Sequence, residues 1–97
     1  MAKFKLGQVL TTAGVAAKCE DSKEFSHFVQ KSLGRYYKCD WGETCEEDCK
    51  VNDDAVKDGD RILAAYHYKE ESGATTVIWI ITEWDRSATT VLFPDEY

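Results

Sequence analysis

The sequence contains no uncharged apolar run that approaches the roughly 20 residues needed to cross a membrane as a helix. Its first residues, Met-Ala-Lys-Phe-Lys-Leu, also lack the apolar core of a secretory signal peptide. We therefore expect a cytoplasmic protein that makes no contact with a membrane. In that compartment the four cysteines are expected to be thiols rather than disulfides.

Recognisable catalytic signatures are missing as well. The chain has no phosphate-binding loop, no nucleophile elbow and no paired-histidine metal motif. It also has no internal repeats, low-complexity tracts or linkers, so residues 1–97 are expected to form one domain. We expect no enzymatic activity, no catalytic residues, no cofactor and no bound metal.

Apolar residues make up 43% of the chain and include twelve aromatics, which is enough for a folded core. Three strand-like runs lie close together near the C-terminus, at residues 61–69, 76–82 and 89–93. The first alternates between apolar and polar positions, and the second is apolar almost without interruption, as in a central strand. Short turn sequences separate the runs, which predicts an antiparallel meander with residues 77–82 in the middle.

The sequence pattern of the N-terminal half predicts two helices and a candidate fourth strand. Residues 3–10 alternate, although Gly7 weakens the strand. A short helix at 13–20, capped by Thr11 or Thr12, would turn three residues inward: Val15, Ala16 and Cys19. A second helix opens at Asp21 or Ser22, ends at Gly34, and carries one apolar stripe: Phe25, Phe28, Val29 and Leu33.

A third helix is predicted at residues 45–58. Thr44 and Glu47 have the spacing of a capping box, and Gly59 is suited to end the helix. Trp41 is expected to anchor the preceding loop in the edge of the core. The fold class is therefore α+β: a three-stranded, or with residues 3–10 four-stranded, antiparallel meander sheet with two to three helices packed on one face.

The net charge of −6 is concentrated in one segment. Residues 40–60 contain nine acids and two lysines and so carry −7, whereas the rest of the chain carries +1. A protein with this distribution should repel nucleic acid rather than bind it directly. The acidic segment is either a solvated helix face or a recognition surface for a basic protein partner.

Cys39, Cys45 and Cys49 lie close in sequence, with His67 further along. Their spacing differs from that of zinc knuckles, and two helical cysteines four residues apart serve more often in packing than in metal binding. The acids around them should raise the thiol pKa, which disfavours a nucleophile. A small metal-binding regulator or enzyme built on these three cysteines remains the alternative hypothesis.

The turn after the second strand groups Glu83, Asp85, Arg86 and Ser87. These are either turn residues with Arg86 as a local ion-pair partner, or part of a binding feature. For a partner-binding site we select nine residues from the acidic segment and this turn: Trp41, Glu43, Glu46, Glu47, Asp48, Asp53, Asp54, Asp85 and Arg86. A homo-oligomer that uses an exposed sheet face or edge strand is a further possibility.

Several short strings occur together in this chain: Trp41-Gly42, Glu46-Glu47-Asp48, Asn52-Asp53, Gly59 with Arg61-Ile62-Leu63, and the C-terminal ITEWDRSATTVLFPDEY. In this combination the chain resembles, over nearly its whole length, a family of small bacterial proteins usually labelled hypothetical or plasmid-related. It departs from that pattern at Trp84 and Phe93, where the family has a smaller residue and a leucine, and in its cysteines.

The resemblance implies a bacterial, mobile-element or phage setting. It implies no established activity and supplies no catalytic residues. Together with the concentrated negative charge, it leads us to expect a non-enzymatic, acidic protein-binding module. One such role is inhibition of a nucleic-acid-binding host defence complex, of the anti-CRISPR or anti-restriction type.

Overall fold

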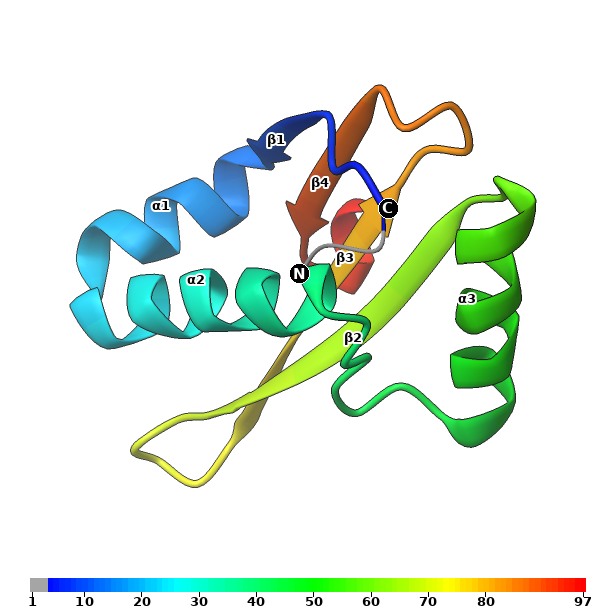
Figure 1. Cartoon of the computed structure of the whole chain (residues 1–97). Coiled ribbons are helices and arrows are strands. Elements are labelled where there is room, and N and C mark those ends of the chain that lie inside the picture. Colours follow the sequence, from blue (N-terminus) through cyan, green and yellow to red (C-terminus); the bar gives the residue numbers. More distant parts are fainter. Residues whose placement is uncertain (1–3) are drawn as a thin grey trace.

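The computed structural model describes residues 4–97 and has the expected α+β architecture (Figure 1). Its elements are β1 (Gln8–Thr11), α1 (Ala13–Asp21), α2 (Lys23–Tyr37), α3 (Glu46–Asp58), β2 (Ile62–Lys69), β3 (Thr75–Thr82), β4 (Ala88–Leu92) and the short 3₁₀ helix η1 (Pro94–Glu96). Among the described residues, no helix has both the length and the apolar character required to cross a membrane.

The four strands form one sheet in the order β1-β4-β3-β2. Strands β2 and β3 pair antiparallel along their full length, from Ile62 opposite Thr82 to Lys69 opposite Thr75. Strand β4 runs antiparallel to β3 on its other side. The predicted meander, with residues 77–82 in the interior of the sheet, is confirmed.

The N-terminal strand differs from the prediction in extent and direction. It covers Gln8–Thr11 rather than residues 3–10, and it pairs parallel with β4, so the sheet is mixed. Residue 3 lies outside the described part of the chain. The chain bends at Gly7, which has φ of +65° and packs so closely that a Cβ there would lie 2.4 Å from the Arg86 carbonyl oxygen. Because β1 and β4 are far apart in sequence, no hairpin constrains them to be antiparallel.

Helices α1 and α2 cover one face of the sheet, with α2 crossing in front of it in Figure 1. They contribute Val15, Phe25, Val29 and Tyr36 to a core whose sheet side is formed by six buried residues: Ile62, Ala64, Tyr66, Ile78, Ile80 and Val91. Full burial of side chains of this size contributes about 1.5–3 kcal/mol each, so this layer is the main source of stability. In α1, Ala16 is exposed, which makes its predicted inward position wrong.

Helix α2 begins as predicted, since the Ser22 hydroxyl accepts a hydrogen bond from the Phe25 N–H at 3.1 Å. It does not stop at Gly34 but continues to Tyr37. The extra turn places Tyr36 in the core, where its hydroxyl lies 2.7 Å from the Thr82 hydroxyl. Burial of a tyrosine outweighs the roughly 1 kcal/mol that an internal glycine costs a helix.

The C-terminal tail returns to the start of α1. Glu96 accepts hydrogen bonds from the Thr12 hydroxyl at 2.6 Å and from the Gly14 N–H at 3.2 Å. A Cβ at Gly14 would lie 2.5 Å from that carboxylate. The glycine that weakens α1 in the sequence is therefore where the tail docks. The hydrogen bond from Thr12 lowers the pKa of Glu96.

Candidate partner-binding site

Helix α3, which carries most of the predicted site, lies beside the outer edge of β2 rather than on the helical face (Figure 1). It begins after Cys45 and ends at Gly59, whose φ of +76° is the left-handed conformation expected at a helix C-terminus. The predicted Thr44–Glu47 capping box is wrong. The Thr44 hydroxyl instead donates to the Trp41 carbonyl and accepts from the Ala65 N–H.

Asn52 fixes α3 to the strand edge. Its side-chain N–H donates to the Leu63 carbonyl at 2.8 Å, and its side-chain oxygen accepts from the Leu63 N–H at 3.3 Å. Asn52 is only 3% exposed, so this pair of bonds is shielded from water. One asparagine thus occupies the backbone groups that a further strand would otherwise bind.

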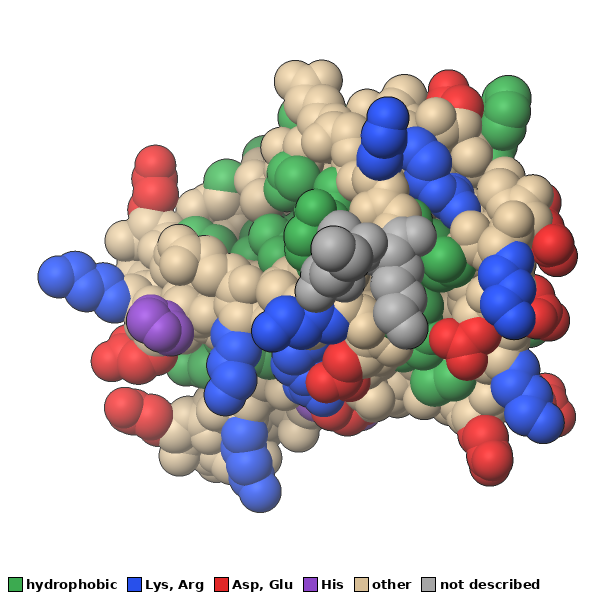
Figure 2. Space-filling view, in the orientation of Figure 1, with side chains coloured by type: hydrophobic (Ala, Val, Ile, Leu, Met, Phe, Trp, Pro, Cys, Tyr) green, Lys and Arg blue, Asp and Glu red, His purple; other side chains and the backbone are tan. Residues whose placement is uncertain are grey.

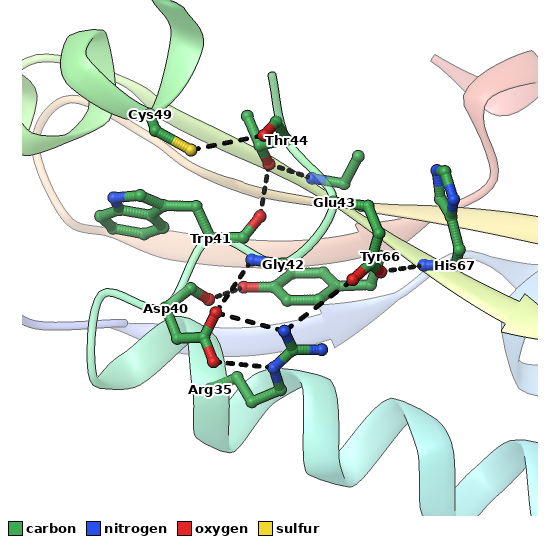
Figure 3. Close-up of polar contacts among 10 residues, drawn as sticks. Arg35, Asp40, Trp41, Gly42, Glu43, Thr44, Cys49, Tyr66 and His67 are labelled. Atoms are coloured by element: carbon green, nitrogen blue, oxygen red, sulfur yellow. Dashed lines mark hydrogen bonds and ion pairs between the residues drawn. The ribbon is translucent and has the colours of Figure 1, made fainter. Parts of the chain in front are cut away.

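The loop before α3 extends the cover of the β2 edge to Ala65 and the His67 N–H. The Glu43 N–H donates to the Ala65 carbonyl at 3.0 Å, and the Ala65 N–H donates to the Thr44 hydroxyl at 2.9 Å. Two residues further along β2, the His67 N–H donates to the Glu43 carboxylate at 2.7 Å (Figure 3). Glu43, predicted to bind a partner, is therefore an internal acceptor.

Arg35 and Asp40 hold this loop against α2. The guanidinium donates to both carboxylate oxygens, at 2.9 and 3.2 Å, and Asp40 also accepts from the Gly42 N–H (Figure 3). The bond from Arg35 lowers the pKa of Asp40. Tyr66 donates its hydroxyl proton to the Asp40 carbonyl at 2.7 Å, and burial raises the pKa of that hydroxyl. Gly42 packs directly on the Tyr66 ring, at a position where a Cβ would overlap the ring.

Trp41 is a core residue, as its predicted anchoring role requires. Its side chain is 4% exposed and meets the Tyr36 ring edge-on, with 5.5 Å between centroids. The indole N–H donates to Asp53 at 2.9 Å. Trp41 therefore leaves only 4% of its surface open to a partner, and its partner-binding role stays a prediction. Asp53 already uses one carboxylate oxygen to hold it.

Arg86 does not form the predicted local ion pair. Its guanidinium donates to backbone carbonyls: Ala55 at 2.9 Å, Asp60 at 2.7 Å and Glu83 at 3.2 Å. A cation over the carbonyls at the end of α3 also complements the helix dipole. Arg86 is half-buried in these contacts and holds the end of α3 to the turn, while its partner-binding role stays a prediction.

Asp85 belongs to the turn, in agreement with one of the two predicted interpretations. Its carboxylate accepts from the Ser87 N–H at 3.1 Å and from the Ser87 hydroxyl at 2.6 Å. The hydroxyl contact lowers the pKa of Asp85. The Asp85 side chain is exposed, and its two hydrogen bonds to Ser87 stabilise the turn.

Seven of the nine predicted binding residues are exposed. Of these, Glu43, Asp53 and Asp85 accept the hydrogen bonds given above, whereas the carboxylates of Glu46, Glu47, Asp48 and Asp54 accept none within residues 4–97. None of these four carboxylates takes part in an ion pair in that part of the chain. Figure 2 shows acidic side chains along the side of the molecule formed by α3, with basic side chains between them. Val51 lies on the same helix and is 59% exposed. We define the α3 surface as the five exposed residues Glu46, Glu47, Asp48, Val51 and Asp54.

The cysteines do not assemble a site. The Cys49 thiol donates to the Thr44 carbonyl, and burial followed by the neighbouring carboxylates raises its pKa, as expected from the sequence. Cys45 is exposed at the start of α3, and the His67 imidazole points away from the other groups in Figure 3. Across the described part of the chain, no three His, Cys, Asp or Glu side chains are placed to hold a metal ion. The geometry that the metal-site hypothesis needs is not present there.

Sequence reasoning missed the residues that position the site. Asn52 and Thr44 bond the β2 edge, and Arg35 and Asp40 hold the covering loop in place, yet none was selected for that purpose. One signal was available: Asn52 stands in the inward stripe of α3, where a polar residue needs a buried partner. Its partner, a strand edge, could not be inferred from the sequence.

Comparisons of the chain with protein-family models, with curated proteins and with solved structures found no match.

Proposed function

We propose that this protein is a non-enzymatic binding module whose docking surface is the α3 surface. Four of its carboxylates are exposed, and they are not used in ion pairs within residues 4–97. The single observation that carries the proposal is this difference among the acids. The carboxylates of Glu43, Asp53 and Asp85 stabilise the fold, whereas those of Glu46, Glu47, Asp48 and Asp54 are left to solvent.

The α3 surface is presented by a fixed element. Asn52 bonds the middle of the helix to β2, and Arg86 holds the carbonyls at its end. A preorganised surface loses little conformational entropy when it binds, so more of its contact energy contributes to affinity. Val51 supplies an apolar point among the charges, a suitable contact for the aliphatic part of a lysine or arginine.

The partner has a basic surface. Helix α3 carries six acids against Lys50 and Lys57, so it attracts a positively charged channel and repels nucleic acid. A defence complex that binds nucleic acid provides such a channel, and occupation of the channel would block its substrate. In the bacterial mobile-element setting implied by the family resemblance, the protein is then an inhibitor of that complex.

Charge reversal tests the proposal. A variant with Glu46→Lys, Glu47→Lys and Asp48→Lys should lose partner binding and keep its fold, because all three side chains are exposed. The matched control reverses three exposed acids elsewhere: Glu71, Glu83 and Asp95. Both variants change the net charge equally, so any difference between them reports position rather than total charge.

The measurement is quantitative affinity capture from a bacterial lysate with the natural chain and both variants. We expect the natural chain and the control variant to retain a set of lysate proteins that the α3 variant does not retain. Added duplex DNA should release the same proteins from the natural chain. Retention of the same proteins by the α3 variant would refute the α3 surface. Capture that DNA does not displace would refute the basic-channel partner.

A further inference from the structure

The second edge of the sheet, formed by β1, is open. Gln8 and Thr12 donate their N–H groups to the carbonyls of Ser87 and Val91, on the β4 side. Because peptide groups alternate in direction along a strand, Val9 and Thr11 point their N–H and C=O groups away from the sheet. Within residues 4–97, no side chain or loop bonds to these outward groups.

Strand β1 also lacks the features that protect strand edges. Its sequence, Gln-Val-Leu-Thr, contains no charge and no proline, and all four residues are exposed. Val9 is 46% exposed and Leu10 is 41% exposed. Natural edge strands usually carry a lysine, a proline, a bulge or a covering segment, and an edge without them is a site for strand pairing.

We propose that two copies of the chain pair through β1 to form a symmetric dimer. The pairing is antiparallel and centred on Leu10. Val9 of each copy then exchanges both backbone hydrogen bonds with Thr11 of the other. Leu10 faces its counterpart as a non-hydrogen-bonded pair, the position at which side chains across an antiparallel ladder come closest. The two four-stranded sheets become one continuous sheet.

The occupant is a second copy rather than an unrelated peptide because the edge is complementary to itself. Two outward-facing residues, each with one donor and one acceptor, satisfy one another completely about a twofold axis. The register also buries two leucines against each other. In α1, which follows β1 directly, the exposed positions Ala13, Ala16 and Ala17 carry small side chains that permit a second copy to approach.

Sedimentation velocity over a concentration series tests the dimer. The expected result is a concentration-dependent change from the 11.0 kDa chain to a species of twice that mass. Leu10→Lys should lower the association constant at least tenfold, because it places two ammonium groups opposite each other. Thr11→Pro should do the same by removing an outward donor that the bond to β4 does not use.

Val51→Lys on α3 is the matched control. It makes the same kind of exposed apolar-to-lysine change far from β1 and should leave association unaltered. Circular dichroism establishes that each variant is folded. Isotope-filtered NOE measurements on a mixture of labelled and unlabelled natural chain need no variant, and should show contacts between Leu10 methyl groups of different copies.

A chain that stays monomeric at every concentration would refute the proposal. A dimer that survives both β1 variants, or one that Val51→Lys dissolves, would also refute it by placing the interface elsewhere. The α3 surface takes no part in the proposed dimer, so these results are independent of the partner-capture experiment.

Discussion

The two edges of this sheet are treated in opposite ways. The β2 edge is eight residues long, and Asn52, Thr44 and Glu43 bond the outward N–H and C=O groups of Leu63 and Ala65 and the N–H of His67. The β1 edge is four residues long, and no described group covers it. The residues that cover β2 come from a helix and a loop, so protection of a strand is not visible in the strand's own sequence. The same cover fixes the acidic helix to the sheet.

Replacement of Asn52, which bonds both backbone groups of Leu63, should have the largest effect on stability. Asn52→Leu leaves the N–H and C=O of Leu63 without partners in a site shielded from water. We expect a loss of about 2–4 kcal/mol in the free energy of unfolding, from lost hydrogen bonds and unsatisfied groups. Urea denaturation measures it. Asp54→Leu, an exposed change on the same helix, should stay within about 0.5 kcal/mol. Equal losses in the two variants would mean that Asn52 does not hold α3.

A matched substitution compares the two edges directly. Thr44→Val removes the hydroxyl that accepts from the Ala65 N–H, and it should cost about 1–2 kcal/mol. Thr11→Val makes the same chemical change in β1, where the hydroxyl has no described hydrogen bond, and should cost less than about 0.5 kcal/mol. Denaturation midpoints of the two variants, measured side by side on dilute protein, give the comparison. A larger loss of stability in Thr11→Val than in Thr44→Val would contradict the conclusion that the β2 edge is covered and the β1 edge is open.

Acid should weaken the cover of β2 slightly. The pKa of Asp40 is lowered by Arg35, so its contribution to stability is present above the ordinary value of 3.8 and is lost as pH falls through the lower folded value. The stability difference between the natural chain and Asp40→Asn should therefore be largest near pH 5–7 and vanish toward pH 2. Urea midpoints measured across this range test the sign. A difference that grows on acidification would contradict it.

Local sequence patterns predicted the elements whose determinants are local. The meander followed from strand alternation and short turns, and the end of α3 followed from Gly59. Long-range contacts decided the rest. Helix α2 passes Gly34 because Tyr36 has a buried partner 46 residues away at Thr82.

The candidate site divides in the same way. Exposure of the acids on α3 was predictable from their helical spacing. The burial of Trp41 was also predicted, but the hydrogen-bond partners of Trp41 and Arg86 were not, because the indole N–H and the guanidinium meet groups of α3 only in the folded chain. Charge and aromatic character alone made both residues look like binding residues.

Amide hydrogen exchange on dilute protein, resolved by NMR, tests the difference between the edges most directly. The amides of Leu63, Ala65 and His67 should exchange as slowly as those of the central strands, whereas the amides of Val9 and Thr11 should exchange fast. Fast exchange at Ala65, or slow exchange at Val9 and Thr11 in the monomer, would contradict a sheet with one covered and one open edge.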